Sequence, residues 1–191
     1  VPPGLPARSL PELIALARRE SLTYASVGSG SLAHLGAELF RVRTGLELVH
    51  VPYRSAPAAQ QAVMAGEVSI FFDTPITAVP LVKDGRVRAL GVSTRERSPL
   101  LPDVPAIAET VPGYEVLGWN GILAPAATPQ AIVELLNREL CAILAEPEIR
   151  QKLETQGASP APTDPERFAR LIRDDVAKWG ELIRNAGIKP E

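Results

Sequence analysis

The sequence predicts an α/β protein with a parallel sheet, and three observations lead to this fold class. Short apolar strands alternate with amphipathic helices along the first half of the chain. The strands are apolar on both faces, as in a parallel sheet that helices cover on both sides. The 191 residues are 46% hydrophobic and 22% charged, which is a globular composition with enough chain to bury a core.

Composition also excludes several classes of protein. Twenty Lys and Arg residues face 22 Asp and Glu residues, and the net charge of −2 argues against a nucleic-acid binder that relies on phosphate contacts. No apolar run reaches about 18 residues, so we expect no membrane-spanning segment. Cys141 is the single cysteine, which excludes an intrachain disulfide and a multi-cysteine metal site. It lies among apolar residues of a predicted helix, where a packed thiol is expected rather than a nucleophile.

Caps and hydrophobic periodicity place the elements of the first half. Ser9 and Glu12 form a capping-box pattern at the start of the first helix. Gly45 and Gly66 follow apolar-periodic segments and are expected to end helices. The expected strands are 22–26, 46–51, 68–73 and 87–93, and the expected helices are 10–20, 32–43, 55–66 and 74–83.

The second half begins with a proline-rich connector at 99–112, which includes a helical turn near 106–110. The pattern then predicts a strand at 115–124 and helices at 128–145, 147–156 and 164–187. These helices and one strand do not close a core, so they need a sheet that the chain does not supply. We therefore predict two domains: an α/β lobe at 1–113 with its connector at 99–113, and a strand with C-terminal helices of an incomplete lobe at 114–191.

The segment that joins the strand 22–26 to the next helix is the main candidate for chemistry. Free backbone N–H groups and the positive end of the helix dipole meet there, so an anion is favoured. Glycines permit positive φ, and serine hydroxyls donate to a carboxylate or phosphate. The same residue types are also ordinary turn and cap residues, so both interpretations stay open. The residues concerned are Ser26, Gly28, Ser29, Gly30 and Ser31.

Two further loops are expected at the same edge of the sheet, because parallel strands end at one edge and ligands bind there. Tyr53, Arg54 and Ser55 offer a phenol, a guanidinium group and a helix cap. Asp73 and Thr74 follow the third strand. Asp73 either caps the next helix or accepts a hydrogen bond from a ligand.

Neither histidine is a convincing catalytic base. His34 lies in the first turns of the helix after the loop, where it contacts a ligand or packs against the sheet, and packing is favoured. His50 lies inside an apolar strand and is expected to be a core residue with its polar atoms satisfied.

A nicotinamide-binding oxidoreductase is the alternative that the loop itself suggests. Gly28, Gly30 and Ala33 fit the dinucleotide fingerprint. That fingerprint requires an acidic residue at the end of the next strand, whereas this strand ends in Val51-Pro52-Tyr53 and Glu47 lies at its beginning. A partner for hydride transfer is also missing from the pattern.

The order of these motifs resembles the Bug/TctC family, the solute-binding proteins of tripartite tricarboxylate transporters, over essentially the whole chain. The motifs are Tyr24-Ala25-Ser26, Gly28-x-Gly30-Ser31, His34-Leu35, His50-Val51-Pro52-Tyr53-Arg54, Gly66-x-Val68, Phe72-Asp73, Gly85-x-Val87-Arg88-Ala89-Leu90, Arg97-Ser98-Pro99, Pro102-Asp103-Val104-Pro105, Pro112-Gly113-Tyr114-Glu115, Trp119-x-Gly121, Ala124-Pro125 and Ala186-Gly187-Ile188.

The resemblance implies a type II periplasmic-binding-protein (Venus-flytrap) fold with two α/β lobes, the first of them incomplete in this chain. It implies capture of a small carboxylate (a di- or tricarboxylate, an acidic amino acid or an aromatic acid) and delivery to membrane permease subunits. It implies a periplasmic location in a bacterium. It also implies that the protein is not an enzyme, needs no cofactor or metal, and does not bind nucleic acid. The ligand carboxylate would be gripped by Ser26, Gly28, Gly30 and Ser31, with His34 beside them.

The sequence departs from the family pattern in several places. It begins at Val1 without an export signal or the first-lobe strand and Asp-containing loop of the family, which fits roughly the C-terminal two-thirds of such a protein. Ser55, Ser69 and Thr74 stand where other residues are frequent, so the identity of the carboxylate stays open. A ligand-sensing regulatory domain of similar shape is a further alternative, although it would need a fused DNA-binding helix-turn-helix.

Overall fold

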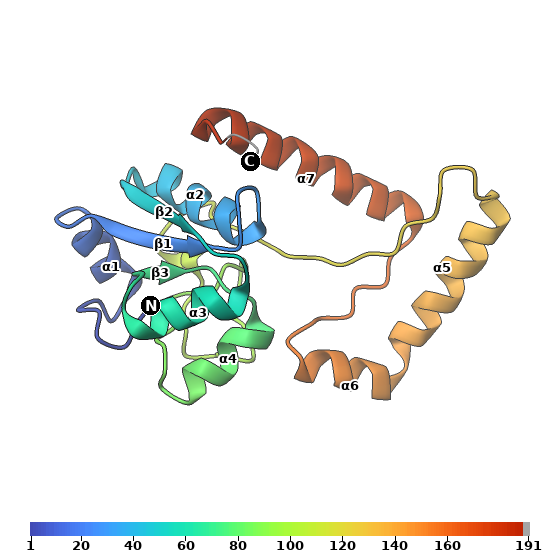
Figure 1. Ribbon diagram of the computed structural model, residues 1–191. Helices are drawn as coiled ribbons and strands as arrows, with labels where there is room; N and C mark the ends of the chain where they lie inside the picture. The colour runs from blue at the N-terminus through green and yellow to red at the C-terminus, as the bar shows by residue number, and fades with distance from the viewer. Residues whose placement is uncertain (189–191) are drawn as a thin grey trace. The chain divides into compact units, whose positions relative to one another are not determined.

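Figure 1 shows the protein as a computed structural model, in which residues 1–188 are described. The chain forms two compact units: unit 1 comprises residues 1–118 and 181–191, and unit 2 comprises residues 119–180. The division at 113/114 stays a prediction, and residues 189–191 of the predicted second domain lie outside the described residues.

A three-stranded parallel sheet forms the centre of unit 1. Its strands are β1 (Leu22–Ser26), β2 (Leu48–Pro52) and β3 (Ile70–Phe71), in the order β2-β1-β3. Every strand therefore ends at the same edge, and Ser26 is level with Pro52 in the β1–β2 pairing. This arrangement confirms the predicted α/β class.

The helices of unit 1 begin where the caps predict, but α1 ends at Ala17, before the predicted end at residue 20. They are α1 (Leu10–Ala17), α2 (Leu32–Thr44), α3 (Ala56–Ala65) and α4 (Pro75–Lys83). The hydroxyl oxygens of Ser9, Ser31 and Ser55 accept first-turn N–H groups of α1, α2 and α3. Gly45 and Gly66 end α2 and α3 in the left-handed region, at φ 67° and 77°. Figure 1 shows α2 on one side of the sheet and α3 on the other.

Several predicted strands are shorter or absent. The strand predicted at 68–73 forms only at β3, and the segment 87–93 contributes a single bridge, between Val92 and Ala106. The strand predicted at 115–124 does not form in the described residues, although the Val116 N–H donates to the Ser93 carbonyl. A strand exists only where a neighbouring backbone satisfies its hydrogen-bonding groups, and apolar patterning does not reveal whether that neighbour is present.

Aromatic and aliphatic side chains build the core of unit 1. The rings of Phe40, Phe72 and Tyr114 lie 6.1–6.3 Å apart, and the Tyr114 hydroxyl donates to the Gly36 carbonyl at 3.1 Å. Burial raises the pKa of the Tyr114 phenol far above its usual value. The connector contributes a short 3₁₀ turn, η1 (Ile107–Glu109), where a helical turn was predicted.

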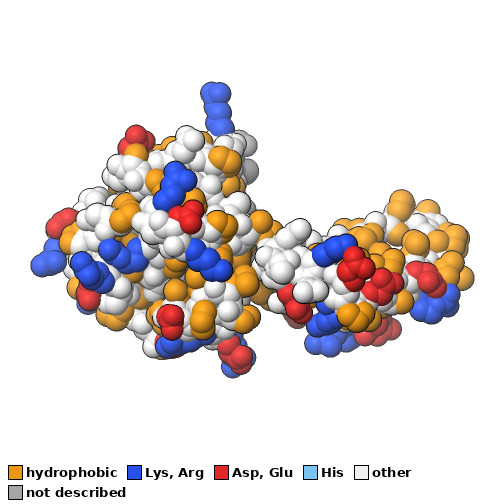
Figure 2. Space-filling view, turned by 90° about the horizontal axis from the view of Figure 1, so that it is seen from below, with side chains coloured by type: hydrophobic (Ala, Val, Ile, Leu, Met, Phe, Trp, Pro, Cys, Tyr) orange, Lys and Arg blue, Asp and Glu red, His pale blue; other side chains and the backbone are white. Residues whose placement is uncertain are grey.

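Unit 2 contains α5 (Gln130–Ala145), α6 (Pro147–Thr155) and most of α7 (Pro165–Ala186). No residue of unit 2 is buried. Contacts within it include the Asn137 amide donating to the Thr163 carbonyl at 2.8 Å, the Trp119 indole donating to Asp175 at 2.6 Å, and an edge-on contact between the rings of Trp119 and Phe168. Figure 2 shows hydrophobic side chains at the surface over α5 and α6. Along residues 1–188, the helices lack the combination of length and apolar character that crossing a bilayer requires.

Candidate functional site

The loop between β1 and α2 is a tight turn held by its own hydroxyl groups. Gly28 and Gly30 have φ values of 116° and 77°, which residues with a side chain rarely adopt. The Ser31 hydroxyl donates to the Gly28 carbonyl at 2.7 Å, and its oxygen accepts the His34 N–H at 3.3 Å. Ser31 therefore closes the turn and caps α2 at the same time.

Ser26, the last residue of β1, joins this loop to the sheet through its hydrogen bonds. Its side chain is fully buried, and its oxygen accepts the Gly28 N–H at 3.1 Å. The Ser26 oxygen also lies 2.6 Å from Nε2 of His50, and the Ser26 carbonyl accepts the Tyr53 N–H at 2.9 Å. The hydroxyl thus joins the loop to β2.

The first turn of α2 presents backbone donors at the mouth of the loop. The N–H groups of Leu32 and Ala33 occupy positions that an α-helix leaves without an internal acceptor. Within residues 1–188, no other group takes up these two donors. The positive end of the helix dipole lies at the same place, so the geometry favours an anion here.

The two histidines lie beside this loop as a stacked pair. Their ring centroids are 4.1 Å apart and the ring planes differ by 6°. Nδ1 of His34 accepts the Gly30 N–H at 3.0 Å. His34 is buried, as packing against the sheet requires, but its ring also bonds to the predicted loop. His50 is only partly buried, so the expectation of a core residue is wrong: β2 is an edge strand, and one of its sides remains open.

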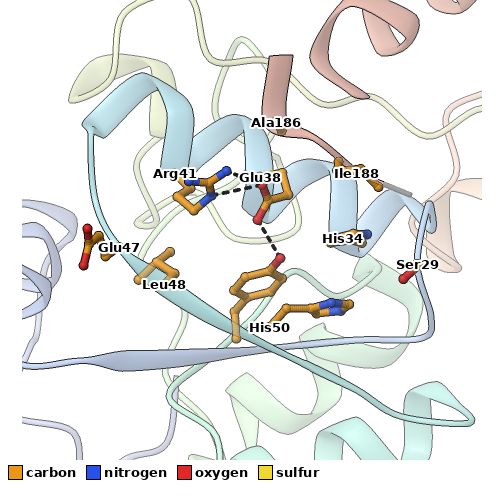
Figure 3. Close-up of a pocket in the computed structure, with 10 residues that line it drawn as sticks. Ser29, His34, Glu38, Arg41, Glu47, Leu48, His50, Ala186 and Ile188 are labelled. Carbon is orange, nitrogen blue, oxygen red and sulfur yellow. Dashed lines mark hydrogen bonds and ion pairs between the residues drawn. The ribbon is translucent and has the colours of Figure 1, made fainter. Parts of the chain in front are cut away.

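A pocket of about 430 Å³ opens beside the stacked histidines. Figure 3 shows Ser29 and His34 at one end of it, Glu47 and Leu48 at the other, and Glu38 between them. The lining residues are Tyr24, Ser29, His34, Glu38, Arg41, Glu47, Leu48, His50, Ala186 and Ile188.

A partly buried ion pair forms one wall of the pocket. The Tyr24 hydroxyl donates to one oxygen of Glu38 at 2.7 Å, and the Arg41 guanidinium group contacts the other at 2.8 Å. Burial alone would raise the pKa of Glu38, but the hydrogen bonds from Arg41 and Tyr24 outweigh it and hold the pKa below its usual value. Burial and the bond to Glu38 raise the pKa of Tyr24 far above its usual value. Glu38 is therefore a carboxylate and Tyr24 a neutral phenol at neutral pH.

The loop after β2 lies at the same sheet edge. The Tyr53 side chain packs against the core cluster that contains Ala25 and Val63. Ser55 caps α3, with its oxygen accepting the Ala58 N–H at 3.4 Å. Arg54 is exposed. None of the predicted residues of this loop lines the pocket described above.

Asp73 and Thr74 form a separate cluster at the start of α4. One Asp73 oxygen accepts the Gln60 amide at 2.6 Å, and the other accepts the Thr74 N–H at 2.8 Å and the Thr77 hydroxyl at 2.9 Å. The Thr74 hydroxyl lies 2.9 Å from that of Thr77. The Asp73 carboxylate thus organises the start of α4 and ties it to α3.

Sequence reasoning missed Tyr24, Glu38 and His50 as parts of the site. Two signals were available. Parallel register places Tyr24 level with His50, and their rings lie 5.0 Å apart. His34, Glu38 and Arg41 share one face of α2, because their spacing of four and three residues matches the helical repeat. As for metals, residues 1–188 contain no cluster of three or more His, Cys, Asp or Glu side chains that could hold an ion.

The sequence is similar to those of known proteins. One relative, the UPF0065 protein in the tcbD-tcbE intergenic region of Pseudomonas sp. strain P51, is 38% identical over 187 residues, which is 96% of this chain and 56% of that protein. The chain thus spans about half the length of this curated relative.

Solved structures agree with this relationship. Rpa4515 of R. palustris with adipate has a TM-score of 0.88 and 36% identity, over 98% of this chain and 64% of its own. The periplasmic binding protein BugD has a TM-score of 0.86 and 27% identity, over 100% and 65%. MatC of Rhodopseudomonas palustris with bound malate has a TM-score of 0.80 and 28% identity, over 95% and 64%.

The fold is therefore that of the periplasmic TctC and Bug binding proteins, and this chain matches 64–65% of the length of the first two structures. The TctC family, described as the tripartite tricarboxylate transporter family receptor, matches residues 1–188. Because the match covers nearly the whole chain, this protein belongs to the TctC family.

Proposed function

We propose that this chain is part of a periplasmic receptor that captures a small carboxylate and delivers it to the permease of a tripartite tricarboxylate transporter. The observation that carries the proposal is the likeness, over 98% of the chain, to a structure that contains adipate. A second similar structure contains malate. Both ligands are small dicarboxylates, which makes a dicarboxylate the first ligand to test.

The loop at 26–34 offers the chemistry that such a ligand needs. A carboxylate at the start of α2 would accept the N–H groups of Leu32 and Ala33, while the Ser31 hydroxyl, which donates to the Gly28 carbonyl, keeps the turn in place. These groups bind and orient a carboxylate without transferring atoms, so the proposed role is capture rather than catalysis. Closure around the ligand would follow if the closed state binds it more tightly than the open state.

A thermal-shift screen tests this function with the chain as it stands. Adipate, malate, citrate, acetate and NAD⁺ are added separately, and the midpoint of unfolding is measured. A ligand at 100 times its Kd stabilises the folded state by about 2.7 kcal/mol, which is easily detected. We expect di- or tricarboxylates to raise the midpoint. A shift with NAD⁺ alone would overturn the proposal in favour of a nicotinamide-binding protein.

A pair of glycine variants tests the loop itself. Gly30 and Gly45 have similar positive φ values, 77° and 67°, and an added Cβ meets no atom within 4 Å at either position. Valine should therefore cost similar stability at both, but only Gly30→Val places a branched side chain beside the start of α2. We expect Gly30→Val to lose carboxylate binding and Gly45→Val to retain it, as measured by calorimetry. Equal affinities in the two folded variants would show that the loop is only a turn.

A further inference from the structure

One of the stacked histidines, His34, occupies a backbone donor that an anion-binding loop would otherwise offer. Gly30 is exposed, yet its N–H donates to Nδ1 of His34 at 3.0 Å. An Nδ1 atom that accepts a hydrogen bond carries no proton, so the His34 ring in this structure is neutral, with its proton on Nε2. The exposed turn of the loop is thus held by an uncharged imidazole.

Adding a proton to Nδ1 would change the loop in two ways that favour an anion. The Gly30 N–H and a protonated Nδ1 are both donors, so their hydrogen bond must break, which frees the Gly30 N–H. The ring also becomes a cation next to the start of α2, where the helix dipole is already positive. A ligand carboxylate compensates both changes, because it accepts hydrogen bonds and carries negative charge.

The closeness of the two rings disfavours a second positive charge once one ring is protonated. The ring centroids are 4.1 Å apart. Two positive charges at about that distance repel by about 1 kcal/mol in water and about 4 kcal/mol near a protein surface. His50 is also engaged on both sides, by the Ser26 hydroxyl at 2.6 Å and by the Tyr24 ring at 5.0 Å.

Three charged side chains line the pocket beside the pair in the described part of the chain: Glu38, Arg41 and Glu47. Glu38, one turn further along α2, interacts electrostatically with His34 and favours its cation, while Arg41 offsets part of that negative charge. Tyr24 of β1 is neutral. Glu47, the residue that precedes β2, lines the end of the pocket away from His34. No arginine or lysine other than Arg41 lines this pocket in the described part of the chain.

We propose that binding of a carboxylate at the 26–34 loop is coupled to the uptake of one proton by His34, with His50 remaining neutral and holding the loop through Ser26. The inference rests on the proposed carboxylate binding and adds its pH dependence. The proton comes from the solvent and is bound at Nδ1 as the Gly30 N–H turns to the ligand. By linkage, affinity rises as the pH falls, by at most about tenfold for each pH unit.

Calorimetry in paired buffers measures this coupling directly. Adipate is titrated into the full chain at pH 7, where both its carboxyl groups are ionised, in phosphate and in Tris, whose ionisation enthalpies differ. The difference between the observed enthalpies gives the number of protons taken up. We expect a value well above zero and no greater than one, with weaker binding at pH 8 than at pH 6.

Two variants assign the proton to a residue. In His34→Asn the amide oxygen can accept the Gly30 N–H but cannot take up a proton, so we expect binding that is independent of pH and releases or takes up no proton. In His50→Gln we expect weaker binding, because the contact with Ser26 changes, but an unchanged number of protons. Proton uptake that persists in His34→Asn, or disappears in His50→Gln alone, overturns the assignment to His34.

Nuclear magnetic resonance provides a second measurement that needs no variant. The Cε1 protons of the two histidine rings are followed from pH 5 to 9 with and without adipate. We expect adipate to move the titration midpoint of one ring upward and to leave the other ring neutral. Adipate binding without proton uptake and without a shifted midpoint overturns this inference alone. Absence of binding by every carboxylate of the screen overturns the proposed function, and this inference with it.

Discussion

Unit 1 and unit 2 are both rich in amphipathic helices, but they differ in what those helices pack against. In unit 1, α2 and α3 pack on a sheet, and side chains such as Phe40, Ala59 and Val63 are almost completely buried. In unit 2, the apolar face of α5 stays partly exposed. Ile132, Leu136 and Ile143 of α5 are each 46–47% exposed.

The difference shows that helices of this chain form a core only where they pack against the sheet. A parallel sheet presents a continuous apolar surface, and a helix laid on it buries a whole stripe of side chains. Helices that touch only each other along a short contact leave most of that stripe in water. The exposed apolar surface of unit 2 is of the kind that marks a site of association.

Hydrogen exchange offers the largest contrast between the units. Amides in the middle of α2 should exchange only through global unfolding, which for a domain requires about 5–15 kcal/mol. Amides of α5 should exchange through local openings of almost no cost, since no buried side chain holds that helix in place. The measurement is exchange of the intact chain followed by mass spectrometry of its peptides. Equal protection of α2 and α5 would mean that α5 is held by packing as firmly as α2.

Deletion of an apolar side chain should reveal the same difference in free energy. Phe40→Ala removes a ring that is 1% exposed and contacts Phe72 and Tyr114, so we expect a loss of about 3–5 kcal/mol. Leu136→Ala removes a side chain that is 47% exposed, and the change should stay within about 0.5 kcal/mol. Urea denaturation measures both. A similar cost for the two variants would mean that α5 is buried in solution.

The helices of unit 1 follow from local sequence signals, which explains why their positions could be predicted. Ser9, Ser31 and Ser55 satisfy free N–H groups within their own first turns, and Gly45 ends α2 through its own backbone conformation. The strands depend on partners distant in sequence. Residues 87–93 are as apolar as β1, but they find a partner only at Val92.

The candidate site also combines features that follow from local sequence with features that depend on residues distant in sequence. The loop at 26–31 could be predicted, because glycine and serine identify a turn before a helix by themselves. The role of His50 could not, since it depends on β2 being an edge strand and on the register that places it level with Tyr24. The sequence also does not reveal that Asp73 bonds to Gln60 of α3, because that contact joins two helices.

Ion pairs offer a smaller contrast, and one that depends on pH. The Glu38 side chain is 8% exposed and bonds to Arg41 and Tyr24, so Glu38→Gln should cost about 1–3 kcal/mol at pH 7. Glu148 and Lys152 of α6 are 78% and 65% exposed, and Glu148→Gln should cost a few tenths of a kcal/mol, about 0.3–0.5 at most. Urea denaturation at several pH values measures both.

The direction of the pH effect follows from the lowered pKa of Glu38. Its contribution to stability is fully present above its usual pKa of 4.5 and is lost as the pH falls below that value toward the pKa of the folded state. The wild type should therefore approach Glu38→Gln in stability as the solution is acidified. A gap between the two that stays constant from pH 7 down to pH 3 would show that Glu38 is not held as a carboxylate in the folded state.

Helix caps give the smallest effect, and they distinguish the units by where the loss appears. Ser55→Ala removes the acceptor for the Ala58 N–H, and α3 packs against β1 and β3, so the unfolding free energy of unit 1 should fall by about 0.5–1 kcal/mol. Asp164→Ala removes the acceptor for the Arg167 N–H, at the shorter distance of 2.7 Å. Because no buried side chain of unit 2 couples the start of α7 to a core, that loss should appear as fraying. Circular dichroism should record less helix in Asp164→Ala with an unchanged unfolding midpoint, and a midpoint shift as large as that of Ser55→Ala would mean that the units unfold together.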